Sequence, residues 1–156
     1  MKRREFIALL GGAAALMPAQ TSGVVARPAS SVHDKLVGSW SFVSSVNTRN
    51  DGTLVDRWGP NTRGILMFDG QGHFSQIITG SESRMFGAKT YCAFGDYEYD
   101  AGNQTLSLKF NGCSIAKAIG SVQERKVLQL TADELKYLNP LTASGTVAEV
   151  LWKRLV

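Results

Sequence analysis

The segment Lys35-Leu36-Val37-Gly38-Ser39-Trp40-Ser41-Phe42-Val43-Ser44-Ser45-Val46 decides how the rest of this chain can fold. Beyond Gly38, which suits a sharp entry of the chain, Trp40, Phe42, Ser44 and Val46 fall on one side of an alternating pattern. Alternation with a period of two is typical of a strand. We therefore predict that this segment is the first strand of a closed antiparallel sheet.

Short alternating segments continue from His33 to the end of the chain, separated by turn residues at intervals of about a dozen positions. None of the longer stretches has the spacing of an amphipathic helix. This arrangement is typical of an antiparallel sandwich or barrel. The sequence therefore predicts an all-β domain.

Two glycine-containing turns set the first pairs of strands. Residues 49–53 suit a three-residue hairpin loop with Gly52 in the left-handed conformation, and residues 69–73 repeat the device with Gly72. The first turn predicts the pairs Thr48 with Leu54, Val46 with Asp56, and Ser44 with Trp58. The second predicts Phe68 with Phe74 and Leu66 with Gln76, with Ile78 following on the same side.

A third hairpin is predicted around Gly102-Asn103, taken as a two-residue loop. Its register places Tyr99, Tyr97 and Gly95 opposite Leu106, Leu108 and Phe110 on one face, and Asp96 opposite Lys109 on the other. Phe94 falls on the polar face, and the pattern does not explain it. A slip of one residue would disrupt both the apolar face and the charge pair, so the register is well determined.

The same register places Cys92 opposite Cys113. Cysteines directly opposed on neighbouring strands lie near disulfide distance. We predict a disulfide bond that closes a loop of about 22 residues and stabilises the fold by about 3 kcal/mol. The alternative is a pair of unlinked thiols without a role.

The C-terminal part of the chain offers one more hairpin and a final strand. A loop at Ala132-Asp133 would pair Leu130 with Leu135 and Leu128 with Tyr137. Residues 147–156 alternate Val150, Trp152 and Arg154 against Glu149, Leu151 and Lys153. If this last strand pairs beside the first, no edge stays open, and we predict a single antiparallel up-and-down barrel of about eight strands.

The N-terminal residues 1–19 have the composition of an export signal. The basic head Lys2-Arg3-Arg4 precedes an apolar run to Leu16 that falls short of the roughly 20 residues needed to span a bilayer. Arg3-Arg4 with the following Phe6-Ile7 resembles the bacterial twin-arginine signal; an ordinary secretory signal is the alternative. Cleavage is expected after residue 19 or 26, residues 20–32 read as a flexible spacer, and the mature chain is expected in the bacterial periplasm or secreted.

Charge and length limit the partners of the mature chain. The full sequence has 17 basic and 13 acidic residues, and loss of residues 1–19 leaves 14 and 12. A net charge of +2 gives no reason to expect a nucleic-acid partner. The remaining 137 residues suit one domain, for which we expect residues 33–156, with no membrane span and a monomeric or weakly oligomeric state.

Several separated motifs occur together in one known family. They are Leu36-Val37-Gly38-Ser39-Trp40, Trp58-Gly59-Pro60, Arg63-Gly64-Ile65-Leu66, Asp69-Gly70-Gln71-Gly72-His73, Phe94-Gly95-Asp96-Tyr97-Glu98-Tyr99-Asp100 and Leu151-Trp152-Lys153-Arg154. In them the chain resembles the bacterial lipocalin-like domain family, with a barrel of the calycin type, over nearly all of the mature sequence. The resemblance implies that Trp40 lies inside, in cation–π contact with Arg154 of the last strand. Residues 81–90 are shorter than the insertion that family members usually carry, so ligand residues do not transfer there.

The barrel interior is the candidate binding site for a small apolar molecule. The predicted interior residues are mainly large and apolar, with Ser44, Asp56 and Gln76 as possible polar contacts. The full predicted set is Trp40, Phe42, Leu54, Asp56, Trp58, Leu66, Phe68, Phe74, Gln76, Ile78, Tyr97, Tyr99, Leu106, Leu108 and Phe110. The same residues could instead fill the core completely and leave no room for a ligand.

Two other functions stay open from the sequence. A cofactor-independent isomerase or cyclase would use Asp56, Tyr97 or Tyr99 for acid–base chemistry inside the pocket. A periplasmic protein-interaction module would use residues 81–90 and 111–121, of which 114–120 could form one helical turn over the barrel mouth. We expect neither a cofactor nor a metal, because the two histidines are 40 residues apart and lack the spacing of a metal site.

Overall fold

A computed structural model describes residues 32–49, 51–56, 58–84, 87–140 and 146–155 of the chain. The predicted export signal, both of its candidate cleavage sites and nearly all of the predicted spacer lie outside the described residues. The elements are α1 (Val32–Leu36), β1 (Gly38–Thr48), β2 (Leu54–Asp56), β3 (Arg63–Phe68), β4 (His73–Arg84), β5 (Gly87–Asp100), β6 (Thr105–Cys113), the 3-10 helix η1 (Ala116–Ala118), β7 (Val122–Leu130), β8 (Glu134–Asn139) and β9 (Val147–Arg154).

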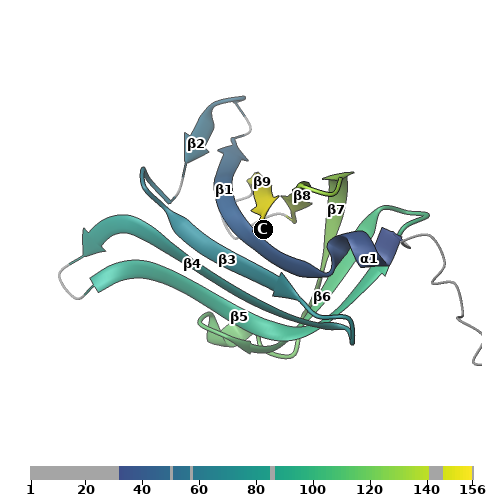
Figure 1. Cartoon of the computed structure of the whole chain (residues 1–156). Helices are drawn as coiled ribbons and strands as arrows, with labels where there is room; N and C mark the ends of the chain where they lie inside the picture. Colours follow the sequence, from purple (N-terminus) through teal and green to yellow (C-terminus); the bar gives the residue numbers. More distant parts are fainter. Residues whose placement is uncertain (1–31, 50, 57, 85–86, 141–145, 156) are drawn as a thin grey trace, which may run out of the picture.

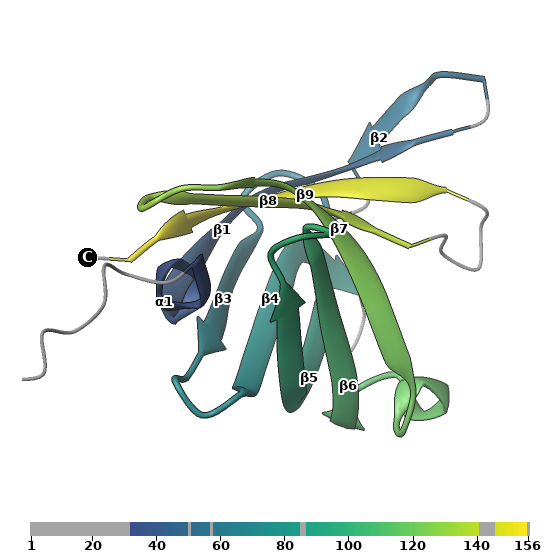
Figure 2. The ribbon, with the colours of Figure 1, turned by 90° about the vertical axis from the view of Figure 1, so that its right-hand side faces the viewer.

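The sheet closes on itself, as the sequence predicts. Strands follow the order β2-β1-β3-β4-β5-β6-β7-β8-β9, all neighbours are antiparallel, and β9 also pairs with β1. Eight of the strands, β1 and β3 to β9, form the barrel, while short β2 pairs with the far end of β1 and projects from the wall (Figure 1). Figure 2 shows β1, β8 and β9 lying across the strands β3 to β6. No described helix is long and apolar enough to cross a membrane.

One end of the barrel is closed by α1, together with the start of β1 and the end of β9 (Figure 2). Leu36 of α1 and Trp40 of β1 are fully buried, and the Trp40 indole donates a hydrogen bond to the Leu36 carbonyl at 2.9 Å. The Arg154 guanidinium lies 4.2 Å from the centre of the Trp40 ring and donates to the Val37 carbonyl at 2.9 Å. The predicted contact between Trp40 and Arg154 is confirmed.

The turns set the registers largely as predicted. The structure contains the pairs Thr48–Leu54, Val46–Asp56, Phe68–Phe74, Leu66–Gln76, Tyr99–Leu106, Tyr97–Leu108, Gly95–Phe110, Asp96–Lys109 and Leu130–Leu135. Two details differ. Ser44 pairs with Leu151 of β9 and not with Trp58, and the β5–β6 loop spans residues 101–104.

Bulges in three strands change which residues face inward. An extra residue interrupts the pairing at Val43 in β1, at Asn111 in β6 and at Leu128 in β7. A bulge sets two residues against one and so reverses the alternation beyond it. As a result, Ser45 is buried in place of Ser44, and Tyr137 pairs with Val127 in place of the predicted Leu128.

The bulge at Asn111 also overturns the predicted disulfide. It shifts the register by one residue, so that Cys113 pairs with Ala93 and the exposed Cys92 has no cysteine opposite it. Both cysteines are free thiols. The close approach of β6 to β5 demands a glycine here, because a Cβ on Gly95 would lie 1.9 Å from the Lys109 carbonyl oxygen.

The barrel interior contains one hydrophobic core, most of which fills the closed half. The core consists of Leu36, Trp40, Phe42, Leu66, Phe68, Phe74, Ile78, Ala93, Tyr97, Leu106, Leu108, Phe110, Val127, Leu135, Tyr137, Ala148, Val150 and Trp152. Edge-to-face aromatic pairs such as Phe42–Trp152 and Phe74–Phe110 contribute to it. Phe94, unexplained by the sequence pattern, is 58% exposed on the outer wall, where its ring lies over Gly112.

Candidate ligand-binding cavity

A cavity of about 850 Å³ opens into the barrel at the end away from α1. Its apolar walls come from β2–β3, β4, β8–β9 and the η1 segment, and polar side chains are interspersed between them. The lining residues are Ser45, Asn47, Trp58, Gln76, Ile78, Lys89, Thr90, Tyr91, Ser114, Ile115, Lys117, Ala118, Ser121, Gln123, Arg125, Asn139, Pro140, Ala148 and Val150. Cavities of this size hold small organic ligands in other proteins.

The bulge in β1 explains why this end of the barrel is polar inside. Phe42 points into the packed half, whereas beyond Val43 it is Ser45 and Asn47 that are buried. Both are small polar residues that leave space where aromatic residues would fill it. Opposite them on β9 lie Val150 and Ala148, and alanine adds little volume. The cavity therefore begins where the bulge changes the face of β1.

Arg125 on β7 is the most unusual residue of the cavity, because its side chain is only 3% exposed. Its Nη1 donates a hydrogen bond of 2.8 Å to the Tyr137 hydroxyl, and the guanidinium lies 4.9 Å from the centre of the Tyr137 ring. The Trp152 indole donates to the same hydroxyl at 3.0 Å. This network joins the cavity to the packed half of the barrel.

Three buried polar atoms have no hydrogen-bond partner among the described residues, and all three belong to side chains that line the cavity. They are Gln76 Oε1, Arg125 Nε and Asn139 Oδ1. Buried polar groups are nearly always paired, so such exceptions require an explanation, for example a bound molecule. All three atoms border the same cavity, where a bound molecule could pair with them.

Two aromatic residues frame the cavity. Burial raises the pKa of the Tyr91 hydroxyl, which therefore stays protonated at neutral pH. The Lys89 ammonium lies 4.8 Å from the centre of the half-buried Trp58 ring. Trp58 is held in place by the turn that precedes it, where the Asp56 carboxylate accepts hydrogen bonds from the backbone N–H groups of Trp58 and Gly59 at 2.8 and 3.2 Å.

The comparison with known families agrees with this architecture. A model of the lipocalin-like domain family matches residues 37–155, which include every barrel strand. The chain belongs to the lipocalin-like domain family. No match was found among curated proteins.

Two solved structures are similar to this lipocalin-like chain. One is a de novo designed fluorescence-activating β-barrel, with a TM-score of 0.47 and 13% identity over 80% of this chain and 97% of that one. The other is the bovine odorant binding protein in complex with a selenium-containing odorant, with a TM-score of 0.47 and 18% identity over 83% of this chain and 76% of that one. Family membership follows from the sequence match over residues 37–155.

The interior residues predicted from the sequence divide into three groups in this lipocalin-like barrel. Three of them line the cavity: Trp58, Gln76 and Ile78. Most of the others are buried away from it in the packed half, namely Trp40, Phe42, Leu66, Phe68, Phe74, Tyr97, Leu106, Leu108 and Phe110, with Tyr99 half-buried beside them. Leu54, 68% exposed, and Asp56 were wrongly placed inside, because β2 lies beyond the closed wall.

The residues proposed for acid–base chemistry do not line the cavity. Asp56 is exposed at the end of β2, and the Tyr97 hydroxyl donates a hydrogen bond of 2.6 Å to the Asp69 carbonyl at the closed end. Tyr99 borders a shallow hollow at the β5–β6 turn instead. Within the described part of the chain, no group of three histidine, cysteine, aspartate or glutamate residues could hold a metal ion.

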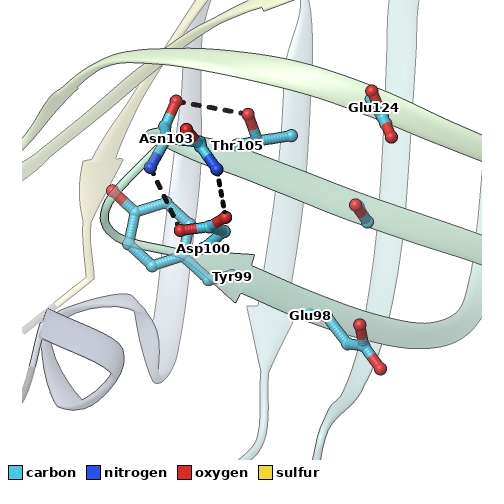
Figure 3. Close-up of a pocket in the computed structure, with 7 residues that line it drawn as sticks. Glu98, Tyr99, Asp100, Asn103, Thr105 and Glu124 are labelled. Atoms are coloured by element: carbon cyan, nitrogen blue, oxygen red, sulfur yellow. Dashed lines mark hydrogen bonds between the residues drawn. The ribbon is translucent and has the colours of Figure 1, made fainter.

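Figure 3 shows that hollow, which has a volume of about 450 Å³ and an acidic rim formed by Glu98, Asp100 and Glu124. The Asp100 carboxylate accepts hydrogen bonds from the backbone N–H of Asn103 at 3.0 Å and from its side-chain amide at 2.6 Å (Figure 3). These bonds lower the pKa of Asp100. They fix the conformation of the turn, so Asp100 and Asn103 have a structural role there.

Sequence reasoning missed Arg125, Asn139 and most of the η1 segment as lining residues. The sequence did contain a signal for Arg125. In an alternating strand, Gln123, Arg125 and Val127 fall on the same face of β7, and Val127 is apolar. A charged residue at an inward-facing position indicates a polar environment or a bound partner inside the barrel, because charged side chains are rarely buried without one. Residues 114–120, which could form one helical turn, contain η1 at residues 116–118. The predicted 81–90 loop is largely strand, and residues 85–86 lie outside the described chain.

Proposed function

We propose that this chain is a carrier that holds one small, largely apolar molecule in the cavity. The observation that supports the proposal is the division of the barrel interior, in which a packed aromatic half adjoins a hollow half of about 850 Å³. Family membership supports small-molecule binding in general. The hollow half has Trp58, Ile78 and Val150 as apolar contacts for such a molecule.

A titration with the neutral probe N-phenyl-1-naphthylamine tests the proposal. The probe should bind saturably, and its own emission should rise as it moves from water into the cavity. The readout is the emission of the probe, because energy transfer can reach it from buried as well as half-buried tryptophans. A single weak, non-saturating phase would contradict the proposal.

A cavity-filling variant provides the matched control. Ala148 is buried on β9 and lines the cavity, so Ala148→Phe should occupy its space and abolish probe binding. Ala101→Phe adds the same side chain at an exposed turn position and should bind the probe as the unchanged protein does. Wild-type affinity in the Ala148→Phe variant would place the probe elsewhere and refute the proposed site.

We also propose that the carrier is exported by the twin-arginine route, on the basis of Arg3-Arg4 and the following Phe6-Ile7. Export of the full chain should cease in the Arg3→Lys, Arg4→Lys double variant, measured by cell fractionation. Undiminished export of that variant would indicate the ordinary secretory route.

A further inference from the structure

The charge of the cavity is uniformly positive. Lys89, Lys117 and Arg125 line it, and the described lining residues include neither aspartate nor glutamate. The exposed acidic residues of the neighbouring strands, such as Glu124 beside Arg125, belong to the outer face by the alternation of the strand. A cavity with low-dielectric walls and charges of one sign attracts the opposite charge.

Arg125 lacks the partner that a buried cation requires. Its side chain is 3% exposed, its one hydrogen bond goes to the neutral Tyr137 hydroxyl, and its Nε has no partner among the described residues. The ion pairs found in the described chain join His73 to Asp69 and Lys136 to Glu149, and none includes Arg125. Charged side chains are almost never fully buried unless paired.

The Tyr137 hydroxyl holds the Arg125 side chain in place. Its oxygen accepts from Arg125 Nη1 and from Trp152 Nε1, and Tyr137 is not among the residues that line the cavity. Arg125 Nε is therefore the unpartnered donor of this group that borders the cavity. Gln76 and Asn139 present unpartnered amide oxygens to the same cavity; these are acceptors, so they would pair with donor groups of a ligand and not with a carboxylate.

The geometry points to a carboxylate as the group that pairs with Arg125. A guanidinium presents its N–H groups in a planar fork that matches the two oxygens of a carboxylate. The inference rests on the proposed function and makes it specific: the ligand is an amphiphile whose carboxylate binds at Arg125 and whose apolar part lies against Trp58 and Ile78.

A matched pair of probes tests this assignment, namely 11-(dansylamino)undecanoic acid and its methyl ester, which differ in the charge of one end. At pH 8 the protein should bind the acid at least tenfold more tightly than the ester, since a hydrogen bond to a charged group has about that effect. Arg125→Met should weaken binding of the acid at least tenfold and binding of the ester less than twofold. Arg125→Lys, which keeps the charge without the fork, should recover part of the preference.

Lys109→Met is the control, because it removes one positive charge from an exposed position on the outer wall of β6. It should leave the affinities for both probes unchanged. Equal binding of acid and ester by the wild-type protein would overturn the carboxylate assignment and leave the carrier proposal standing, and this comparison needs no variant to fold. Equal weakening of both probes by Arg125→Met would also overturn it. Failure of the wild-type protein to bind either probe would refute the carrier proposal itself, and the assignment with it.

Discussion

Arg154 fastens the closed end of the barrel, and its removal should destabilise the whole domain. Its guanidinium lies 4.2 Å from the Trp40 ring centre and donates to three backbone carbonyls, of Val37, Lys35 and Ala132. These acceptors belong to the α1–β1 junction and the β7–β8 turn, which are distant in the sequence. One side chain therefore ties together the beginning and the end of the barrel.

The size of the effect follows from these contacts. A cation–π contact contributes about 0.5–2 kcal/mol, and the partly buried hydrogen bond to Val37 adds about 1.5 kcal/mol. The bonds to Lys35 and Ala132 are exposed, so water can replace most of their contribution. We expect Arg154→Met to lower the free energy of unfolding by about 2–4 kcal/mol, which corresponds to a fall in Tm of roughly 8–16 °C.

Urea unfolding followed by tryptophan fluorescence measures this loss directly. Lys153→Met is the control, because the neighbouring side chain is exposed on the outer wall and its loss should change the free energy by less than about 0.5 kcal/mol. Arg154→Lys should retain part of the cation–π contribution but not the three-way hydrogen bonding. If Arg154→Met unfolds at the same urea concentration as Lys153→Met, the reasoning about closure is wrong.

Three further predictions concern the β3–β4 turn, the cavity and the wall. The Asp69 carboxylate accepts a hydrogen bond from His73 Nδ1 at 2.8 Å, which raises the pKa of His73, while bonds from the His73 backbone N–H first and then its side chain lower the pKa of Asp69 to about 2. Titration by NMR should place the His73 pKa above 6.5 in the wild type and near 6.5 in Asp69→Asn. The stabilisation from His73 is present below pH 6.5 and is lost as pH rises through its raised pKa. The stabilisation from Asp69 is present above pH 3.8 and is lost as pH falls toward 2. Gln76→Leu should raise the free energy of unfolding in urea by about 1 kcal/mol, because it removes a buried oxygen without a partner among the described residues; a loss of stability would show that this oxygen is satisfied. Leu66→Ala should destabilise the domain by about 2–5 kcal/mol and Leu54→Ala by less than about 0.5 kcal/mol, since the first side chain is fully buried and the second exposed; similar losses for the two variants would refute the assignment of inner and outer faces.

The registers of the hairpins were predictable because turn chemistry acts locally. The turns that contain Gly52 and Gly72 each determine the first pair of residues after the turn, and the alternation extends that register along both strands. The prediction fails where an extra residue enters one strand. Beyond Val43, Asn111 and Leu128 the inward positions are exchanged for outward ones, and the cysteine pair predicted from the third hairpin is lost.

By itself, the sequence determined the all-β class and most hairpin registers, and its resemblance to the lipocalin-like family implied the contact of Trp40 with Arg154. The class and the registers depend on local turns and on the alternation of apolar residues along each strand. Only the tertiary structure decided where the barrel is hollow. The positions of the bulges depend on how neighbouring strands curve around the closed wall, and the space left inside depends on the summed volumes of side chains from different strands. The alternation of β7 already directs Arg125 inward, but only the tertiary structure places it beside the hollow part of the barrel.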